Sequence, residues 1–66
     1  MRNTVKEERQ KIQLTQVQLA ELVGVSRQSI FSLEINKYVP SVELSLKLAK
    51  AFGKKVEDIF KLEASD

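Results

Sequence analysis

Two helix-start signals stand eleven residues apart in the chain, and this spacing constrains the fold more than any other feature of the sequence. Thr15 is suited to act as an N-cap, and Gln18 three positions later can complete a capping box. Ser26 repeats the N-cap signal, and Gly24 before it is suited to end a helix in the left-handed conformation. The sequence therefore predicts two helices joined by only three residues. So short a link produces a sharp corner rather than an antiparallel hairpin.

Helical periodicity continues on both sides of this pair. Val5, Arg9 and Ile12 recur at helical spacing before it, whereas Ser41 and Gly53 bound an apolar stretch after it. The predicted helices cover residues 4–13, 16–23, 27–34, 42–52 and 56–60, with a loop at 35–40.

The expected core follows from the inner faces of these helices. The inward residues are Leu19, Leu22, Val23, Ile30, Leu33, Leu48, Ala49 and Phe52. The helix over 42–52 carries more apolar residues than one core stripe needs. Leu44, Leu46 and Ala51 are the excess, so we expect them to be exposed or covered by another chain.

The composition excludes several classes of protein. Sixty-six residues suffice for one small domain spanning residues 1–66. The absence of cysteine and histidine excludes disulfides, thiolate or imidazole metal sites and histidine-based acid–base chemistry. The chain also lacks a nucleophile paired with a base and a glycine-rich phosphate loop. We therefore expect no enzyme, no cofactor, no metal and no small-molecule ligand.

Net charge and hydropathy indicate what kind of partner and which cellular compartment to expect. Eleven Lys and Arg against nine Asp and Glu give a net charge of +2, which favours an anionic partner only weakly. No apolar run is long enough to span a membrane. The first residues lack the apolar segment of a signal peptide, so we expect a cytoplasmic protein.

Two helices joined by a sharp three-residue corner form the helix-turn-helix arrangement. It holds one helix across the DNA backbone while the next enters the major groove, N-terminus first. Arg27 and Gln28 open that second helix; Arg suits the O6 and N7 atoms of guanine, and Gln suits N6 and N7 of adenine. Phe31 and Ser32 lie one turn further on the same outer side, within reach of a thymine methyl. We expect these four residues to contact bases, the alternative being a solvated face.

Polar residues on either side of the corner suit the phosphate backbone. Gln16 begins a helix, where free backbone amides bind phosphate. Lys37, Tyr38 and the cap Ser41 supply donors around the loop, although Tyr38 could simply cover it. In that loop Asn36 is the residue best able to adopt a left-handed conformation. The expected phosphate contacts are Thr15, Gln16, Asn36, Lys37, Tyr38 and Ser41.

The stretch from Leu14 to Ser41 closely resembles the Cro/CI-type helix-turn-helix of the XRE family of transcriptional regulators. The resemblance rests on L-T-Q-x-x-L-A, G-V-S-R-Q-S-I and L-E-x-x-K-x-x-P-S, and it spans residues 5–60. It implies a compact, all-α, five-helix domain that binds operator DNA, usually as a homodimer. The length resembles short single-domain repressors of the cytolysin-regulator kind. By that resemblance Met1 to Thr4 would pair with Lys61 to Glu63 in a short two-stranded sheet.

The resemblance also assigns an internal ion pair between Arg9 and Glu34, which explains an arginine on an inner stripe. The chain departs from the family pattern at several positions. The family loop commonly reads E-N-G-K, whereas Ile35 and Asn36 stand here, and Phe31 is bulkier than the usual small residue. Lys55 occupies the position where a Ser or Thr cap often precedes the fifth helix, so we expect that helix to be weakly capped.

A homodimer is expected because one recognition helix reads few base pairs. A two-fold axis would place two such helices in successive major grooves, over an inverted-repeat operator. The expected dimerisation region is 42–66, with Leu44, Ile59, Phe60 and Leu62 at the interface. Ile59 and Phe60 have the alternative of packing in the core of their own chain.

The expected function is that of a sequence-specific DNA-binding regulator that acts as a repressor. The alternative is an antitoxin or another protein-interaction module with the same fold, although only about six residues follow Phe60 where a toxin-binding tail would lie. A restriction–modification controller also binds DNA, and the sequence does not separate it from a repressor.

Overall fold

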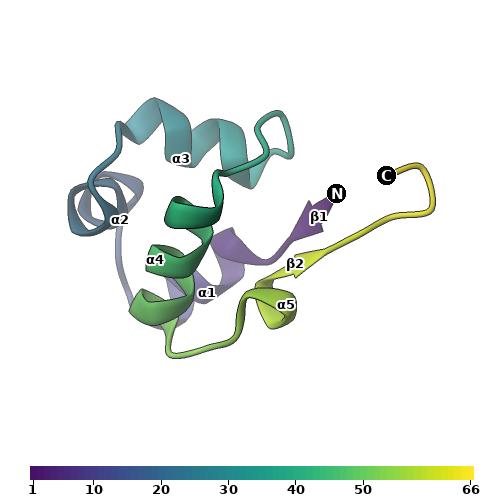
Figure 1. Ribbon diagram of the computed structural model, residues 1–66. Coiled ribbons are helices and arrows are strands. Elements are labelled where there is room, and N and C mark those ends of the chain that lie inside the picture. The colour runs from purple at the N-terminus through teal and green to yellow at the C-terminus, as the bar shows by residue number, and fades with distance from the viewer.

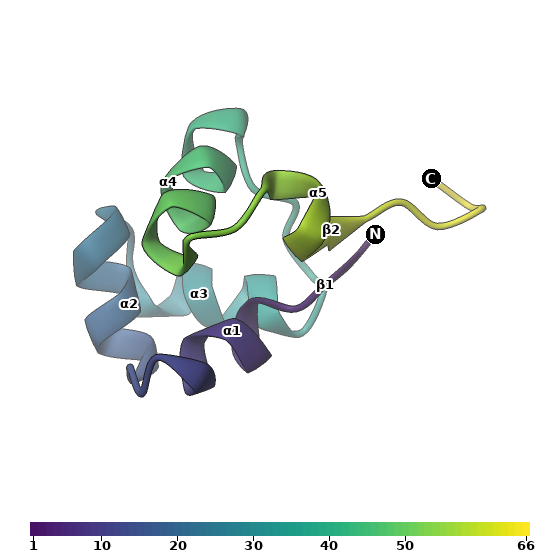
Figure 2. The same cartoon turned by 90° about the horizontal axis from the view of Figure 1, so that it is seen from below.

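The computed structural model describes residues 1–66 as five helices and one small sheet (Figures 1 and 2). In chain order the elements are β1 (Arg2–Asn3), α1 (Val5–Lys11), α2 (Gln16–Val23), α3 (Arg27–Glu34), α4 (Val42–Phe52), α5 (Val56–Ile59) and β2 (Phe60–Lys61). The expected all-α, five-helix fold is therefore confirmed. None of the helices combines the length and apolar character needed to cross a bilayer.

Local capping chemistry explains where α2, α3 and α4 begin. The Thr15 hydroxyl accepts from the Gln18 amide at 3.1 Å, and the Gln18 side chain accepts from the Thr15 amide at 2.8 Å. The predicted capping box is thus confirmed. Ser26 and Ser41 each accept a hydrogen bond from the backbone three residues later, at 3.1 Å. These bonds satisfy amides that have no partner inside the helix.

Left-handed residues lie at the ends of the first four helices. Gly24 ends α2 at φ 76°, as the spacing predicts. The first helix is shorter than predicted, because Ile12 leaves the helix and Gln13 adopts φ 60°. The fifth helix is one residue shorter, since Phe60 belongs to β2. Lys55 makes no side-chain cap, as expected.

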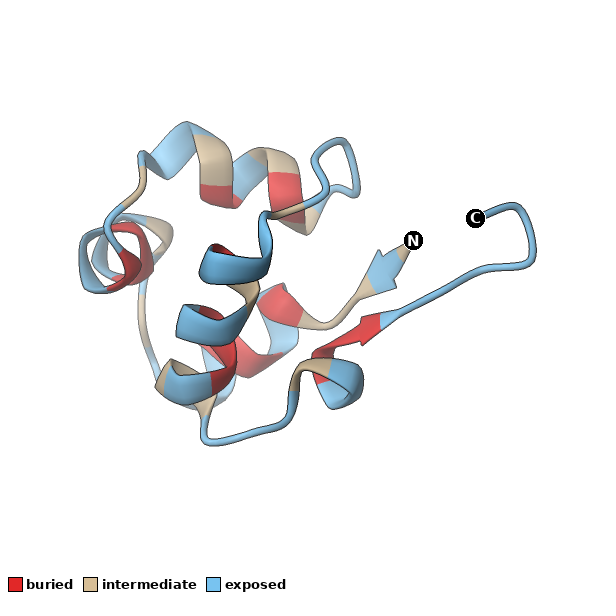
Figure 3. Ribbon diagram, viewed as in Figure 1, coloured by how far each residue is buried: buried red, intermediate tan, exposed pale blue.

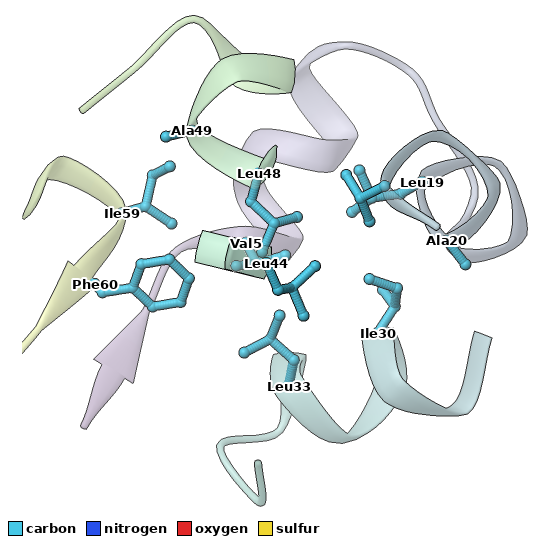
Figure 4. Close-up of a cluster of buried hydrophobic side chains, with 11 residues drawn as sticks. Val5, Leu19, Ala20, Ile30, Leu33, Leu44, Leu48, Ala49, Ile59 and Phe60 are labelled. Atoms are coloured by element: carbon cyan, nitrogen blue, oxygen red, sulfur yellow. The ribbon is translucent and has the colours of Figure 1, made fainter. Parts of the chain in front are cut away.

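All five helices and β2 contribute to one core (Figure 4). Its buried apolar residues are Val5, Leu19, Ala20, Val23, Ile30, Leu33, Leu44, Leu48, Ala49, Ile59 and Phe60. The core of α4 differs from the prediction: Leu44 is only 4% exposed, and Phe52 is half-buried. Leu44 and Leu48 share one helix face, which α4 turns inward. Leu22 is 61% exposed, because α2 packs through the face of Leu19 and Val23 instead.

These placements correct the expected dimer interface. Leu44, Ile59 and Phe60 pack in the core of their own chain, with Phe60 only 9% exposed, so they offer little surface to a second copy. Leu62 alone among the four expected residues is fully available, at 82% exposure.

The two ends of the chain meet in the small sheet, at one side of the helices (Figure 1). The strands are antiparallel, with Arg2 opposite Lys61 and Asn3 opposite Phe60. The expected terminal sheet is confirmed, but β2 begins one residue earlier than predicted. The burial of Phe60 holds that end of the strand against the core.

Candidate DNA-binding surface

The outer side of α3 faces away from the core over its whole length (Figure 3). Arg27, Gln28 and Phe31 are exposed, whereas Ile30 and Leu33 on the opposite side are fully buried. Ser32 is half-buried, and its hydroxyl oxygen accepts from the side-chain Nε2 atom of Gln28 at 3.4 Å. The structure therefore brings the four residues expected to contact bases onto one side of one helix.

The corner before α3 sets the direction of that helix. The Val25 amide donates to the Ala20 carbonyl at 3.0 Å, which closes the end of α2 beyond Gly24. Val25 also packs partly against the core. This corner holds the first turn of α3 at the surface beside α2, the placement that lets a helix enter the major groove by its N-terminus.

A buried ion pair joins α1 to the end of α3. The Arg9 Nε atom donates to the Glu34 carboxylate at 2.7 Å, and the two side chains are only 11% and 3% exposed. A second guanidinium nitrogen donates to the same carboxylate at 3.3 Å, and the third donates to the Leu14 carbonyl at 2.8 Å. The structure therefore places together the two residues expected to form an internal pair.

Gln16 joins this ion pair rather than pointing freely at a phosphate. Its side-chain amide donates to a Glu34 oxygen at 3.0 Å. The first backbone amides of α2 remain without partners inside the helix. An anion at this helix start would thus meet backbone amides, with the Gln16 side chain held in place by Glu34.

Lys37 and Tyr38 are exposed in the loop between α3 and α4. The Lys37 amide donates to the Ser32 carbonyl at 2.9 Å, so the loop begins directly on the last turns of α3. Asn36 adopts φ 62°, the left-handed conformation expected of it. Lys37 and Tyr38 therefore lie just beyond the C-terminal end of the helix that carries the expected base contacts.

Four of the six expected phosphate contacts have side chains engaged within the chain. Thr15 and Ser41 cap helices, and Gln16 binds Glu34. The Asn36 side chain accepts a hydrogen bond from Asn3, a residue that the sequence did not single out. Thirty-three positions separate Asn3 from Asn36, so no local pattern could have revealed this contact.

Two charged residues near the start of α4 form an exposed ion pair. Glu43 in the first turn of α4 binds Lys47 at 2.9 Å. The hydrogen bond from Lys47, together with its positive charge, lowers the pKa of Glu43 below its ordinary value. No group of three acidic, histidine or cysteine side chains is placed to hold a metal ion.

Two helices joined by a sharp three-residue corner, the second with an exposed outer side, form the helix-turn-helix arrangement of DNA-binding domains. The family described as Helix-turn-helix matches residues 5–59. The chain is 49% identical over 63 residues to YgzD of Bacillus subtilis, an uncharacterized HTH-type transcriptional regulator, covering 96% of each chain. It is 52% identical over 60 residues to an uncharacterized HTH-type transcriptional regulator of Methanocaldococcus jannaschii, covering 91% of each. The protein belongs to the XRE family of helix-turn-helix regulators and is a DNA-binding transcriptional regulator.

Proposed function

We propose that this regulator is a repressor that binds an inverted-repeat operator as a homodimer. The observation that carries the proposal is the outer side of α3, where Arg27, Gln28 and Phe31 are exposed together. Arginine and glutamine at the first turn match guanine and adenine edges in the major groove. Occlusion of a promoter requires only DNA binding, so a domain of this kind suffices for repression.

Selection of bound sequences from random duplex DNA tests this function. We expect an enriched inverted repeat, because two copies related by a two-fold axis present two α3 helices to one face of the duplex. The half-site centres should lie about 34 Å apart, one turn of DNA. Recovery of no common sequence would reject base-specific binding and would favour the protein-interaction module.

The surface left for a dimer is an exposed apolar face rather than the core residues first expected. Val39, Val42 and Leu46, around the start of α4, are all more than half exposed. With Met1 they line a shallow apolar groove that Phe60 borders. Continuing the β1–β2 register by one residue places Leu62 opposite Met1, so Leu62 extends this face. Burying this apolar face against a second copy would add to the small stability that a core of this size provides.

Replacing Leu62 and Leu46 together by Ser is expected to convert a dimer into a monomer. Both side chains are largely exposed within one chain, so the change removes apolar contact area between copies without opening the core. Sedimentation at micromolar concentration measures the effect. Leu22→Ser is the matched control, because Leu22 is about as exposed as Leu46 but lies on α2. A monomeric wild type, or a double variant that stays dimeric, contradicts the assignment.

A further inference from the structure

Asn3 on β1 connects three separate parts of the chain through its side chain. Its Nδ2 atom donates to the Leu33 carbonyl at 2.9 Å and to the Asn36 Oδ1 atom at 3.0 Å. Its Oδ1 atom accepts from the Val5 amide at 3.0 Å, at the first residue of α1. Both donor hydrogens and one acceptor site of this amide are therefore used inside the molecule.

The two donor bonds end where α3 passes into the loop that carries Lys37. Leu33 is the last buried apolar residue of α3, and its carbonyl also accepts from the Asn36 amide at 3.1 Å. Asn36 holds a left-handed conformation, which costs an asparagine more than a glycine. The bond from Asn3 offsets part of that cost and uses a side chain that glycine does not have.

The loop itself has little packing to hold it. Ile35, Lys37, Tyr38 and Val39 are all exposed, so side-chain burial constrains this segment weakly. Asn3, in contrast, sits on a strand that is paired with β2 and followed by a bond from the Thr4 amide to the Ile59 carbonyl at 3.0 Å. Asn3 thus ties a weakly packed loop to an anchored part of the fold.

We propose that Asn3 is a positioning residue for DNA binding: it holds Asn36, and through it the loop, so that Lys37 meets the phosphate backbone in a fixed place. The inference rests on the proposed contact of Lys37 with DNA. A loop already ordered in the free protein loses less conformational entropy on binding, so the contact contributes more to affinity.

Two uncharged variants separate the bond between Asn3 and Asn36 from the bond that Asn3 accepts from the Val5 amide. Asn3→Ser keeps a side-chain oxygen able to accept from the amide two residues later, but it is too short to reach Asn36. Asn36→Gly permits the left-handed backbone and removes the acceptor together with the rest of the side chain. Each is expected to weaken binding to selected and random DNA alike by about 3- to 10-fold, the range of one hydrogen-bonded contact. The preferred DNA sequence should not change.

A double-mutant cycle with Lys37→Ala shows whether Asn3 acts through the loop. We expect Asn3→Ser to weaken binding no further once Lys37 has been replaced, because the two changes remove the same contact. The dependence of log K on log[salt] should become shallower by about one for each half-site in the variants that lack Lys37, and by part of that in Asn3→Ser. The proposal is overturned if the losses of binding free energy in Asn3→Ser and Lys37→Ala add fully. It is also overturned if Asn3→Ser leaves the salt dependence of binding unchanged at a temperature well below its melting temperature.

Amide hydrogen exchange without DNA provides a readout that does not depend on the proposed function. In Asn3→Ser and Asn36→Gly the Lys37 amide should exchange at least several-fold faster, while the Leu48 amide in the core of α4 keeps its rate. Unchanged exchange at Lys37 overturns the proposal. A third outcome is faster exchange at Lys37 in the variants while the wild type binds no DNA. It would support the hydrogen-bonded connection from Asn3 to the loop and would reject the proposed function.

Discussion

Replacing Arg27 by Ala is expected to weaken binding to the selected operator by about 1–3 kcal/mol for each half-site, the range of one good bidentate base contact. Arg27 is the first residue of α3 and is exposed, so its guanidinium can reach a guanine edge when the helix enters the groove. The preference at one position in each half-site should relax at the same time. Gln28→Ala should act in the same way at a neighbouring position. Binding measured against the operator and against single-base variants of it provides the test.

Lys37→Ala is the matched control for Arg27→Ala, since it also removes one exposed positive charge but from the loop. It should weaken binding to all sequences and lower the salt slope by about one for each half-site, as loss of a phosphate contact does. If Arg27→Ala weakened operator and random DNA equally, Arg27 would be a phosphate contact and the assignment of base readout would be wrong.

Glu34→Ala is expected to lower the free energy of unfolding by about 3–5 kcal/mol, because it leaves the buried Arg9 guanidinium without its carboxylate. Only 11% of the Arg9 side chain is exposed, so water cannot replace the lost partner fully. The Gln16 side chain loses its acceptor as well. Domains of this size are stable by only about 3–10 kcal/mol in total, so the variant should lose a large part of its stability.

Denaturation by urea or heat measures this effect, and two further variants define its cause. Glu34→Gln keeps the shape and an acceptor oxygen, so it should retain more stability than Glu34→Ala. Glu43→Ala breaks the exposed pair with Lys47 and should change the melting temperature little. Where the Glu34 variants are folded, the preferred DNA sequence should stay that of the wild type. A melting temperature unaffected by Glu34→Ala would contradict a structural role for the pair.

The position of the ion pair also bears on DNA binding. Glu34 lies at the end of α3, Arg9 on α1, and Gln16 at the start of α2. One carboxylate therefore joins the helix that would read bases to the helix start that would face a phosphate. We expect variants at Glu34 to weaken DNA binding through the angle between these helices rather than through a lost contact with DNA.

The features determined by the sequence alone are those whose physical cause lies within a few residues. Thr15, Ser26 and Ser41 mark helix starts because each cap bonds an amide only three positions away. Gly24 marks the corner because glycine takes a left-handed conformation at little cost. With these boundaries set, helical periodicity also determined that Arg27 and Gln28 point away from Ile30 and Leu33.

Only the tertiary structure decided which of several apolar residues are buried and which distant polar groups meet. Leu44, Leu46 and Leu22 are alike as residues, yet α4 turns Leu44 into the core while the other two are exposed. Helix packing decides this, and it depends on all neighbouring helices at once. Asn3 and Asn36 meet because the pairing of β1 with β2 brings the N-terminal strand to the end of α3. Hydrogen bonds between residues so far apart in the sequence form only when the whole fold is in place, so no local pattern predicts them.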